Sequence, residues 1–252
     1  MRRGFTLIEL VLVLVIVAVV THFAVREFGA VEDGRRERTA DAQLEAIRAA
    51  AARFLSDVGR LPRLVAETNG EGRVTWTLAE LWRRPTGVPA YAVTNIGGRV
   101  LAGGGWRGPY LHLPFGRERL LDPWGNPMEA EDDAGLARLL AAADGTVTNV
   151  CHYGARASAD ACRSMPLAPD GGATCSLVVV TPGGEASACR CYVPEDGVVR
   201  ERTGTAANAS QVLFEGLTPG ERLVRVADTN GAAVVRIVTA KGPSTIVEVA
   251  VP

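Results

Sequence analysis

An uninterrupted apolar segment near the amino terminus constrains the fold of this chain more than any other feature. Residues 10–20 carry only aliphatic side chains and follow a short basic leader, Met1-Arg2-Arg3. Residues 5–25 would form a helix of roughly 30 Å at about 1.5 Å per residue, which is long enough to cross a bilayer. A charge at mid-membrane costs about 2.5–3.5 kcal/mol, so Glu9 at the start of this segment requires a physical reason.

A secretory signal peptide is the ordinary alternative for such a segment. Signal peptides have a short apolar centre and end at a small-residue cleavage site. Here the run ends in Thr21-His22-Phe23-Ala24, which is a poor cleavage site. The bias in positive charge barely orients the segment, because Arg35, Arg36 and Arg38 beyond it compete with the two leader arginines. The sequence therefore favours a retained anchor.

The stretch Gly4-Phe5-Thr6-Leu7-Ile8-Glu9-Leu10 resembles the processing site of type IV pilins and of the pseudopilins of type II secretion systems. The resemblance implies that a prepilin peptidase removes the leader, residues 1–4, by cutting after Gly4, and methylates the new amino terminus, Phe5. It also implies a single-pass protein of the inner (cytoplasmic) membrane with its carboxyl-terminal head in the periplasm. Glu9 then occupies the fifth mature position, where this family usually has a glutamate.

Glu9 has two interpretations. The carboxylate can snorkel from the helix end toward the lipid headgroups, which lowers the cost of insertion. Alternatively, it pairs with the free amine of Phe5, in the same chain or in the neighbouring subunit of a filament. Pairing between subunits would fix the axial stagger of packed helices, and this assembly role is our hypothesis.

The helical pattern continues beyond the apolar segment. Apolar residues recur at alternating three- and four-residue steps and so share one helix face: Leu44, Ile47, Ala51, Phe54 and Val58. This stripe is too short for a coiled coil and indicates a helix docked on a globular head. Gly59 and Pro62 then end the helix. We expect one long helix over residues 5–59, with its transmembrane half at 5–25.

Four ordered motifs narrow the resemblance to the major pseudopilins of type II secretion systems. They are Asp57–Pro62, Thr77–Trp82, Gly105–Leu111 and Leu121–Pro127. The second motif lies where that family has a short second helix, and the fourth resembles its DPWGNP loop. We expect the aromatic residues of these motifs to pack in the core. A carbohydrate-stacking platform is the alternative for Trp106, Tyr110 and Trp124.

Beyond Pro127 the sequence departs from that family, whose members hold calcium in a carboxyl-terminal loop. The nearest stretch here, Leu177–Gly184, has glycine or proline where acidic ligands would help. Calcium takes about six to eight oxygen ligands. A solvated loop explains a second acidic cluster more simply: Glu129, Glu131, Asp132 and Asp133. We expect no cofactor, with calcium as the alternative.

Five cysteines lie in this divergent segment: Cys151, Cys162, Cys175, Cys189 and Cys191. Disulfides persist on the periplasmic side of the membrane. Cys151 and Cys162 are candidates for a local bridge, and Cys175 for a bridge with Cys189 or Cys191, but spacing does not decide the connectivity. The odd thiol is free or links subunits. A zinc site using His152 is the rival interpretation, although the spacings match no usual C-x-x-C pair.

In the carboxyl-terminal region, apolar and polar residues alternate as they do in β-strands. This pattern predicts short strands at Arg222–Asp228, Ala233–Thr239 and Thr245–Val251. It faintly resembles half of a carboxypeptidase-regulatory-like or transthyretin-like sandwich. About fifty residues are too few for a whole domain of this kind, so we expect these strands to pack on the sheet of the head.

The predicted class is α+β, a pilin-like fold in which a long amino-terminal helix packs on an antiparallel sheet, with extra carboxyl-terminal strands. The predicted divisions are the leader at 1–4, the helix at 5–59, a head with a cysteine-rich insertion at 60–203, and a strand extension at 204–252.

Enzymatic functions have little support, because the chain has 3 histidines, no serine or cysteine elbow and no phosphate loop. A formal net charge of -1 argues against nucleic-acid binding. We expect a structural subunit of a type II secretion pseudopilus, a filament for protein export. Its partners would be prepilin peptidase, other pilin-like subunits and the inner-membrane assembly platform. The alternative is a minor pilin or a pilus-tip adhesion subunit of a type IV pilus or DNA-uptake system.

Overall fold

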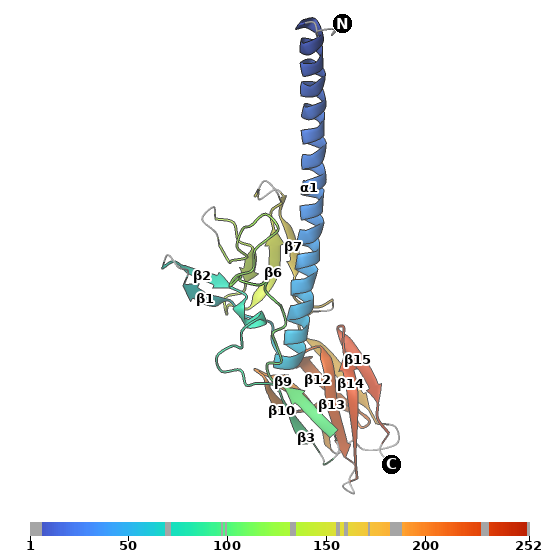
Figure 1. The fold of residues 1–252 in the computed structure, drawn as a ribbon. Helices are drawn as coiled ribbons and strands as arrows, with labels where there is room; N and C mark the ends of the chain where they lie inside the picture. Colours follow the sequence, from blue (N-terminus) through green and yellow to red (C-terminus); the bar gives the residue numbers. More distant parts are fainter. Residues whose placement is uncertain are drawn as a thin grey trace.

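The computed structural model describes residues 7–68, 72–96, 98, 100–131, 135–154, 157–158, 161–170, 172–181, 188–227 and 232–250. The described chain is α+β, as predicted, with an amino-terminal helix, α1, and sheets that are antiparallel apart from one strand pair. Figure 1 shows that α1 projects from a folded part with two units. One unit lies beside the carboxyl-terminal half of the helix, and the other lies beyond its end.

The helix α1 (Leu7–Val58) has two halves with opposite surroundings. Side chains 7–23 and 31–39 are exposed, whereas one face from Ala40 onward is buried. The predicted docking stripe is buried throughout, with exposures of 0–3%. Ala50 and Leu55 widen it. The docked face is therefore confirmed.

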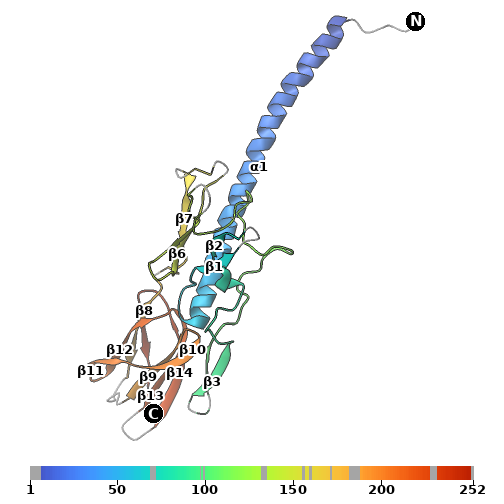
Figure 2. The same cartoon turned by 90° about the vertical axis from the view of Figure 1, so that its left-hand side faces the viewer.

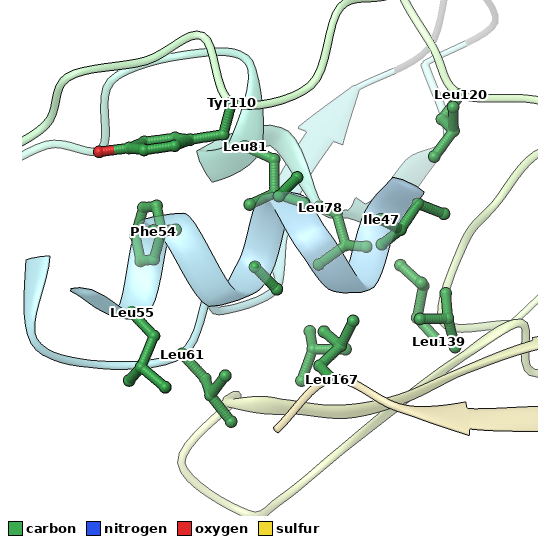
Figure 3. Close-up of a cluster of buried hydrophobic side chains, with 14 of the residues drawn as sticks. Ile47, Phe54, Leu55, Leu61, Leu78, Leu81, Tyr110, Leu120, Leu139 and Leu167 are labelled. Atoms are coloured by element: carbon green, nitrogen blue, oxygen red, sulfur yellow. The ribbon is translucent and has the colours of Figure 1, made fainter. Parts of the chain in front are cut away.

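This face of α1 forms one side of the first hydrophobic core. Figure 3 shows Ile47 and Phe54 of the helix among leucines from several loops and strands. The ring of Phe54 meets Tyr110 edge to face, with centroids 5.6 Å apart. Each large apolar side chain that is fully buried stabilises the fold by about 1.5–3 kcal/mol, so this core holds the helix on the head.

Small antiparallel sheets build the first unit. They are β1 (Val65–Thr68) with β2 (Val74–Thr77), and β5 (Leu139–Ala141) with β6 (Val147–His152) and β7 (Arg163–Pro166). A further antiparallel pair, β3 (Ala92–Ile96) with β4 (Val100–Gly104), lies against the second unit (Figure 1). The short second helix expected at Thr77–Trp82 is a single 3-10 turn, η1 (Ala79–Leu81). Pro85 soon follows and lacks the N–H that a longer helix would need.

The second unit is a β-sandwich of two four-stranded sheets, with orders β10-β9-β13-β14 and β11-β12-β8-β15. Its strands are β8 (Cys175–Val180), β9 (Ala188–Glu195), β10 (Val198–Thr203), β11 (Thr205–Asn208), β12 (Gln211–Leu217), β13 (Gly220–Ala227), β14 (Ala233–Ala240) and β15 (Ser244–Glu248). Inward side chains of both sheets form a second core, separate from the first. Figure 2 shows this unit at the end of α1.

The boundary between the two folded units does not fall at residue 204, where the sequence pattern predicted the start of the strand extension. The carboxyl-terminal strands do not join the sheets of the first unit; they pair with β8 and β9 of the cysteine-rich segment. The roughly fifty carboxyl-terminal residues are too few for a sandwich by themselves, and β8 and β9 of the cysteine-rich segment supply the strands that complete it. The structural boundary falls before Cys175.

Candidate assembly and processing site

Large apolar side chains surround the amino-terminal part of α1. Between Leu7 and Phe23 they are 49–83% exposed. So large an apolar surface is unfavourable in water and marks a contact with lipid or with apolar side chains of a partner. In the part of the chain that the structure describes, no helix combines the length and the apolarity needed to span a membrane.

Glu9 lies in the first turn of α1, where the positive end of the helix dipole favours a carboxylate. Its side chain is exposed between Ile8 and Leu10, which are 76% and 57% exposed. The predicted processing residues, Gly4 and Phe5, lie outside the described residues. The assembly role of Glu9 stays a prediction.

The comparison with known families bears on this segment. The family model described as "Prokaryotic N-terminal methylation motif" matches residues 1–25. The chain carries the type IV pilin-like processing signal. The comparison with curated proteins finds no match. The motif implies a membrane-anchored precursor that prepilin peptidase processes and that assembles with other pilin-like subunits, and it applies equally to pilins and to pseudopilins.

The carboxyl-terminal end of α1 is capped by both folded units. The last carbonyl groups of a helix lack partners within the helix. Here the N–H of Gly59 donates to the carbonyl of Leu55 at 2.9 Å. Gly105, after β4, donates to Asp57 at 2.9 Å, and Gly197, between β9 and β10, donates to Val58 at 2.7 Å. The helix end therefore joins the first unit to the sandwich.

Three of the four motifs that resemble those of major pseudopilins meet at this junction. Arg60 makes a bidentate ion pair with Glu80, at 2.7 and 2.8 Å, and a third contact with Asp196 of the sandwich at 2.8 Å. Glu80 also accepts from the backbone N–H of Arg63, while its own carbonyl accepts from the indole of Trp106 at 3.1 Å. Sequence reasoning missed this network, because only the fold brings its members together.

Neutralising Glu80 tests the importance of that junction. Its side chain is 7% exposed and that of Arg60 is 16% exposed. Glu80→Gln should lower the free energy of unfolding by about 1.5–3 kcal/mol, because a charge-assisted bidentate pair is lost. Urea unfolding of the full chain in detergent, followed by tryptophan fluorescence, measures the change. Asp170→Asn removes a 97% exposed partner of Arg48 and should cost less than about 1 kcal/mol. Equal losses would contradict a special role for Glu80.

Asp57 and Tyr110 form a second network at the helix end. The phenol of Tyr110 donates to the Asp57 carboxylate at 3.1 Å and accepts from the backbone N–H of Arg107 at 2.9 Å. Burial raises the pKa of Asp57, and Arg107 and Tyr110 oppose that shift. Burial also raises the pKa of Tyr110, so its hydroxyl stays protonated and able to donate. Tyr110 is a core residue, which favours packing over carbohydrate stacking.

The five predicted cysteines fall into two groups, and all are free thiols in the structure. Cys151 on β6 is buried and contacts the exposed Cys162 through a side-chain hydrogen bond. The other three, Cys175, Cys189 and Cys191, lie in the sandwich core. The structure thus brings together the members of each predicted set. Whether they bridge in the mature protein stays a prediction.

His152 contacts helix α1. Its Nε2 lies 3.3 Å from a carboxylate oxygen of Asp41, and its ring lies 5.7 Å from that of Trp124 between centroids. Hydrogen bonds from His152 and Arg163 outweigh the effect of burial, so the pKa of Asp41 lies below its usual value. The indole N–H of Trp124 is buried and has no hydrogen-bond partner among the described atoms.

Metal-ligating groups are scattered. Across the described residues, no group of three histidine, cysteine, aspartate or glutamate side chains is placed to hold an ion. Glu129 differs from the solvated position predicted for it, because it is buried and pairs with Arg119 at 3.1 Å. Glu131 is exposed, and Asp132 and Asp133 lie outside the described residues.

A groove of about 1050 Å³ runs along β1 and η1. Leu64–Thr68 form one wall, and Arg83–Thr86 lie among the other lining residues. Two of its three carboxylates, Glu67 and Glu80, already pair with Arg83 and Arg60, each at 2.7 Å. These charges therefore serve the packing of the first unit.

Proposed function

We propose that this protein is a structural subunit of a type II secretion pseudopilus, a periplasmic filament for protein export. One observation carries the proposal. The prepilin-type signal leads directly into a helix whose first half is exposed and apolar and whose second half is docked on a folded head. Such a helix can pack against the same helix of neighbouring subunits while the heads stay outside. The junction motifs similar to those of major pseudopilins support a secretion filament.

The proposal assigns a place to each part of the chain. The leader at 1–4 is cytoplasmic, residues 5–25 cross the inner membrane once, and the two folded units are periplasmic. Prepilin peptidase, related subunits and the inner-membrane assembly platform are the partners. The chain acts without catalysis or a cofactor.

A second candidate is a minor pilin or pilus-tip binding subunit, and the sandwich favours it. This unit has its own core and lies beyond the carboxyl-terminal end of α1, where it lengthens the subunit past the docked head. Immunogold labelling of filaments separates the two candidates. A major subunit decorates the whole length, whereas a tip subunit labels one end.

Processing gives the direct test of the proposed function. Mass spectrometry of the mature protein should show loss of residues 1–4 and a methylated Phe5 amine. Gly4→Val should keep the leader, because the peptidase of this family relies chiefly on the glycine, and Gly34→Ala on the exposed helix surface serves as the control. An intact amino terminus in the wild type, or cleavage near Ala24, would remove the pilin-like interpretation.

A further inference from the structure

Three cysteines converge in the core of the sandwich. Cys175 begins β8 in one sheet, and Cys189 and Cys191 lie on β9 in the other. Their exposures are 3%, 4% and 0%, respectively. Because side chains alternate along a strand, residues 189 and 191 both point into the core, toward the sheet that carries Cys175. The cysteines therefore face one another across the two sheets.

The buried Arg222 lies at the turn between β12 and β13, the end of the sandwich at which Cys175 is placed. Its guanidinium donates to the carbonyl groups of Thr218 and Pro219, at 3.0 and 2.8 Å, and so folds back over the turn between β12 and β13. Burial lowers the pKa of Arg222, and the thiols of Cys191 and Cys175 oppose that shift. Both thiols are thus close enough to this guanidinium to influence its charge.

Strand register places Cys189 further away. Cys191 pairs with Val224 and Cys189 with Val226, so Cys189 lies two residues, about 6.6 Å, further along the sheet from Arg222. Cys175 pairs with Leu217, next to the turn that Arg222 covers. Burial raises the pKa of Cys191 to about 12, and the thiols of Cys189 and Cys175 add to this effect. By strand register, Cys191 is therefore the β9 cysteine nearer to the end of the sandwich that carries Cys175.

We propose that Cys175 and Cys191 form a disulfide that joins the two sheets of the sandwich, and that Cys189 is the odd, unbridged cysteine. The local Cys151–Cys162 contact forms the second bridge. This inference rests on the proposed periplasmic location, where disulfides persist. Burial raises the pKa of Cys189 to about 11, so its thiol stays protonated and unreactive in the folded protein.

The bridge requires an oxidant, which is a protein or small-molecule disulfide. One cysteine thiolate attacks a sulfur of the oxidant and releases its first thiol. The second cysteine then attacks the mixed disulfide, which forms the Cys175–Cys191 bond and releases the second thiol. Two electrons and the two cysteine protons end on the oxidant. Because both sulfurs are buried in the closed sandwich, the reaction takes place during folding.

Peptide mapping of the full-length protein tests the pairing. The protein is isolated from membranes without reductant, denatured, alkylated, and digested with trypsin and a glutamate-specific protease. Arg190 separates Cys189 from Cys191, and Glu185 separates Cys175 from Cys189, so each lies on its own peptide. We expect the peptide of Cys191 to be linked to that of Cys175, with Cys189 alone alkylated. Cys189→Ser should leave no alkylatable thiol and keep both linkages.

The same peptide map distinguishes an error in the proposed cysteine pairing from an error in the proposed periplasmic location. A Cys175–Cys189 or Cys189–Cys191 linkage overturns the pairing. Refolding the full chain into detergent with glutathione disulfide supplies the oxidant in vitro. Five alkylated thiols in the isolated protein, with the Cys175–Cys191 linkage formed on refolding, support the pairing and contradict the periplasmic location. Five thiols in both preparations overturn the pairing.

Discussion

Glu9→Val is expected to abolish filament formation and leave membrane insertion and leader cleavage intact. Valine is more favourable in lipid than glutamate, so the anchor still inserts. The cleavage signal also persists, because the peptidase of this family reads chiefly the glycine at position 4. What is lost is the carboxylate that we expect to pair with the Phe5 amine between subunits. The variant should accumulate as processed monomer in the inner membrane, measured by fractionation and by shearing of filaments.

Two further variants sharpen this prediction. Glu9→Asp keeps the charge but reaches the amine less well, so it should assemble at a low but measurable yield. Glu45→Val removes another exposed carboxylate from the same helix, beyond the apolar segment, and should assemble normally. A wild-type filament yield from Glu9→Val would mean that the carboxylate only snorkels to the headgroups, and the pairing hypothesis would then be abandoned.

Local patterns in the sequence predict those parts of the structure that depend only on residues close together in the chain. The stripe from Leu44 to Val58 predicts the docked face of α1, because helical spacing alone puts its members on one side. The alternation around Val247 and Val249 predicts β15 and its inward face, with Ile246 exposed. The processing motif is recognisable for a similar reason, since a peptidase reads a linear stretch.

Contacts between distant segments lie beyond such patterns. Nothing near Cys175 or Cys189 indicates that β8 and β9 complete a sandwich with β12 to β15, because pairing partners are chosen by the whole set of apolar faces. The Arg60–Glu80 pair likewise joins residues whose spacing matches no local period. For the cysteines, the sequence defines the candidate set, and only the register of β9 against β13 ranks Cys191 above Cys189.

Gly59→Ala should destabilise the folded chain by more than about 4 kcal/mol, an unusually large effect for one methyl group. Gly59 has a φ of +88°, and a Cβ at this position would lie 1.9 Å from the carbonyl oxygen of Pro194 in β9. The backbone of β9 cannot rotate away as a side chain would. Relief requires the sandwich to move from the end of α1, which would break the 2.7 Å bond between Gly197 N–H and the Val58 carbonyl.

Gly87→Ala is the matched control, because it separates backbone strain from the close contact. Gly87 has nearly the same φ, +86°, but among the described residues no atom lies within 4 Å of the point that an alanine Cβ would occupy. Strain alone costs about 1–2 kcal/mol in this region of backbone space. Urea unfolding of the full chain in detergent, followed by tryptophan fluorescence, compares the two variants. The 4 tryptophans, at 76, 82, 106 and 124, all precede the sandwich, so the signal reports on the first core. Equal losses for the two variants would mean that α1 and the sandwich separate without cost, and the shared helix cap would then contribute nothing to stability.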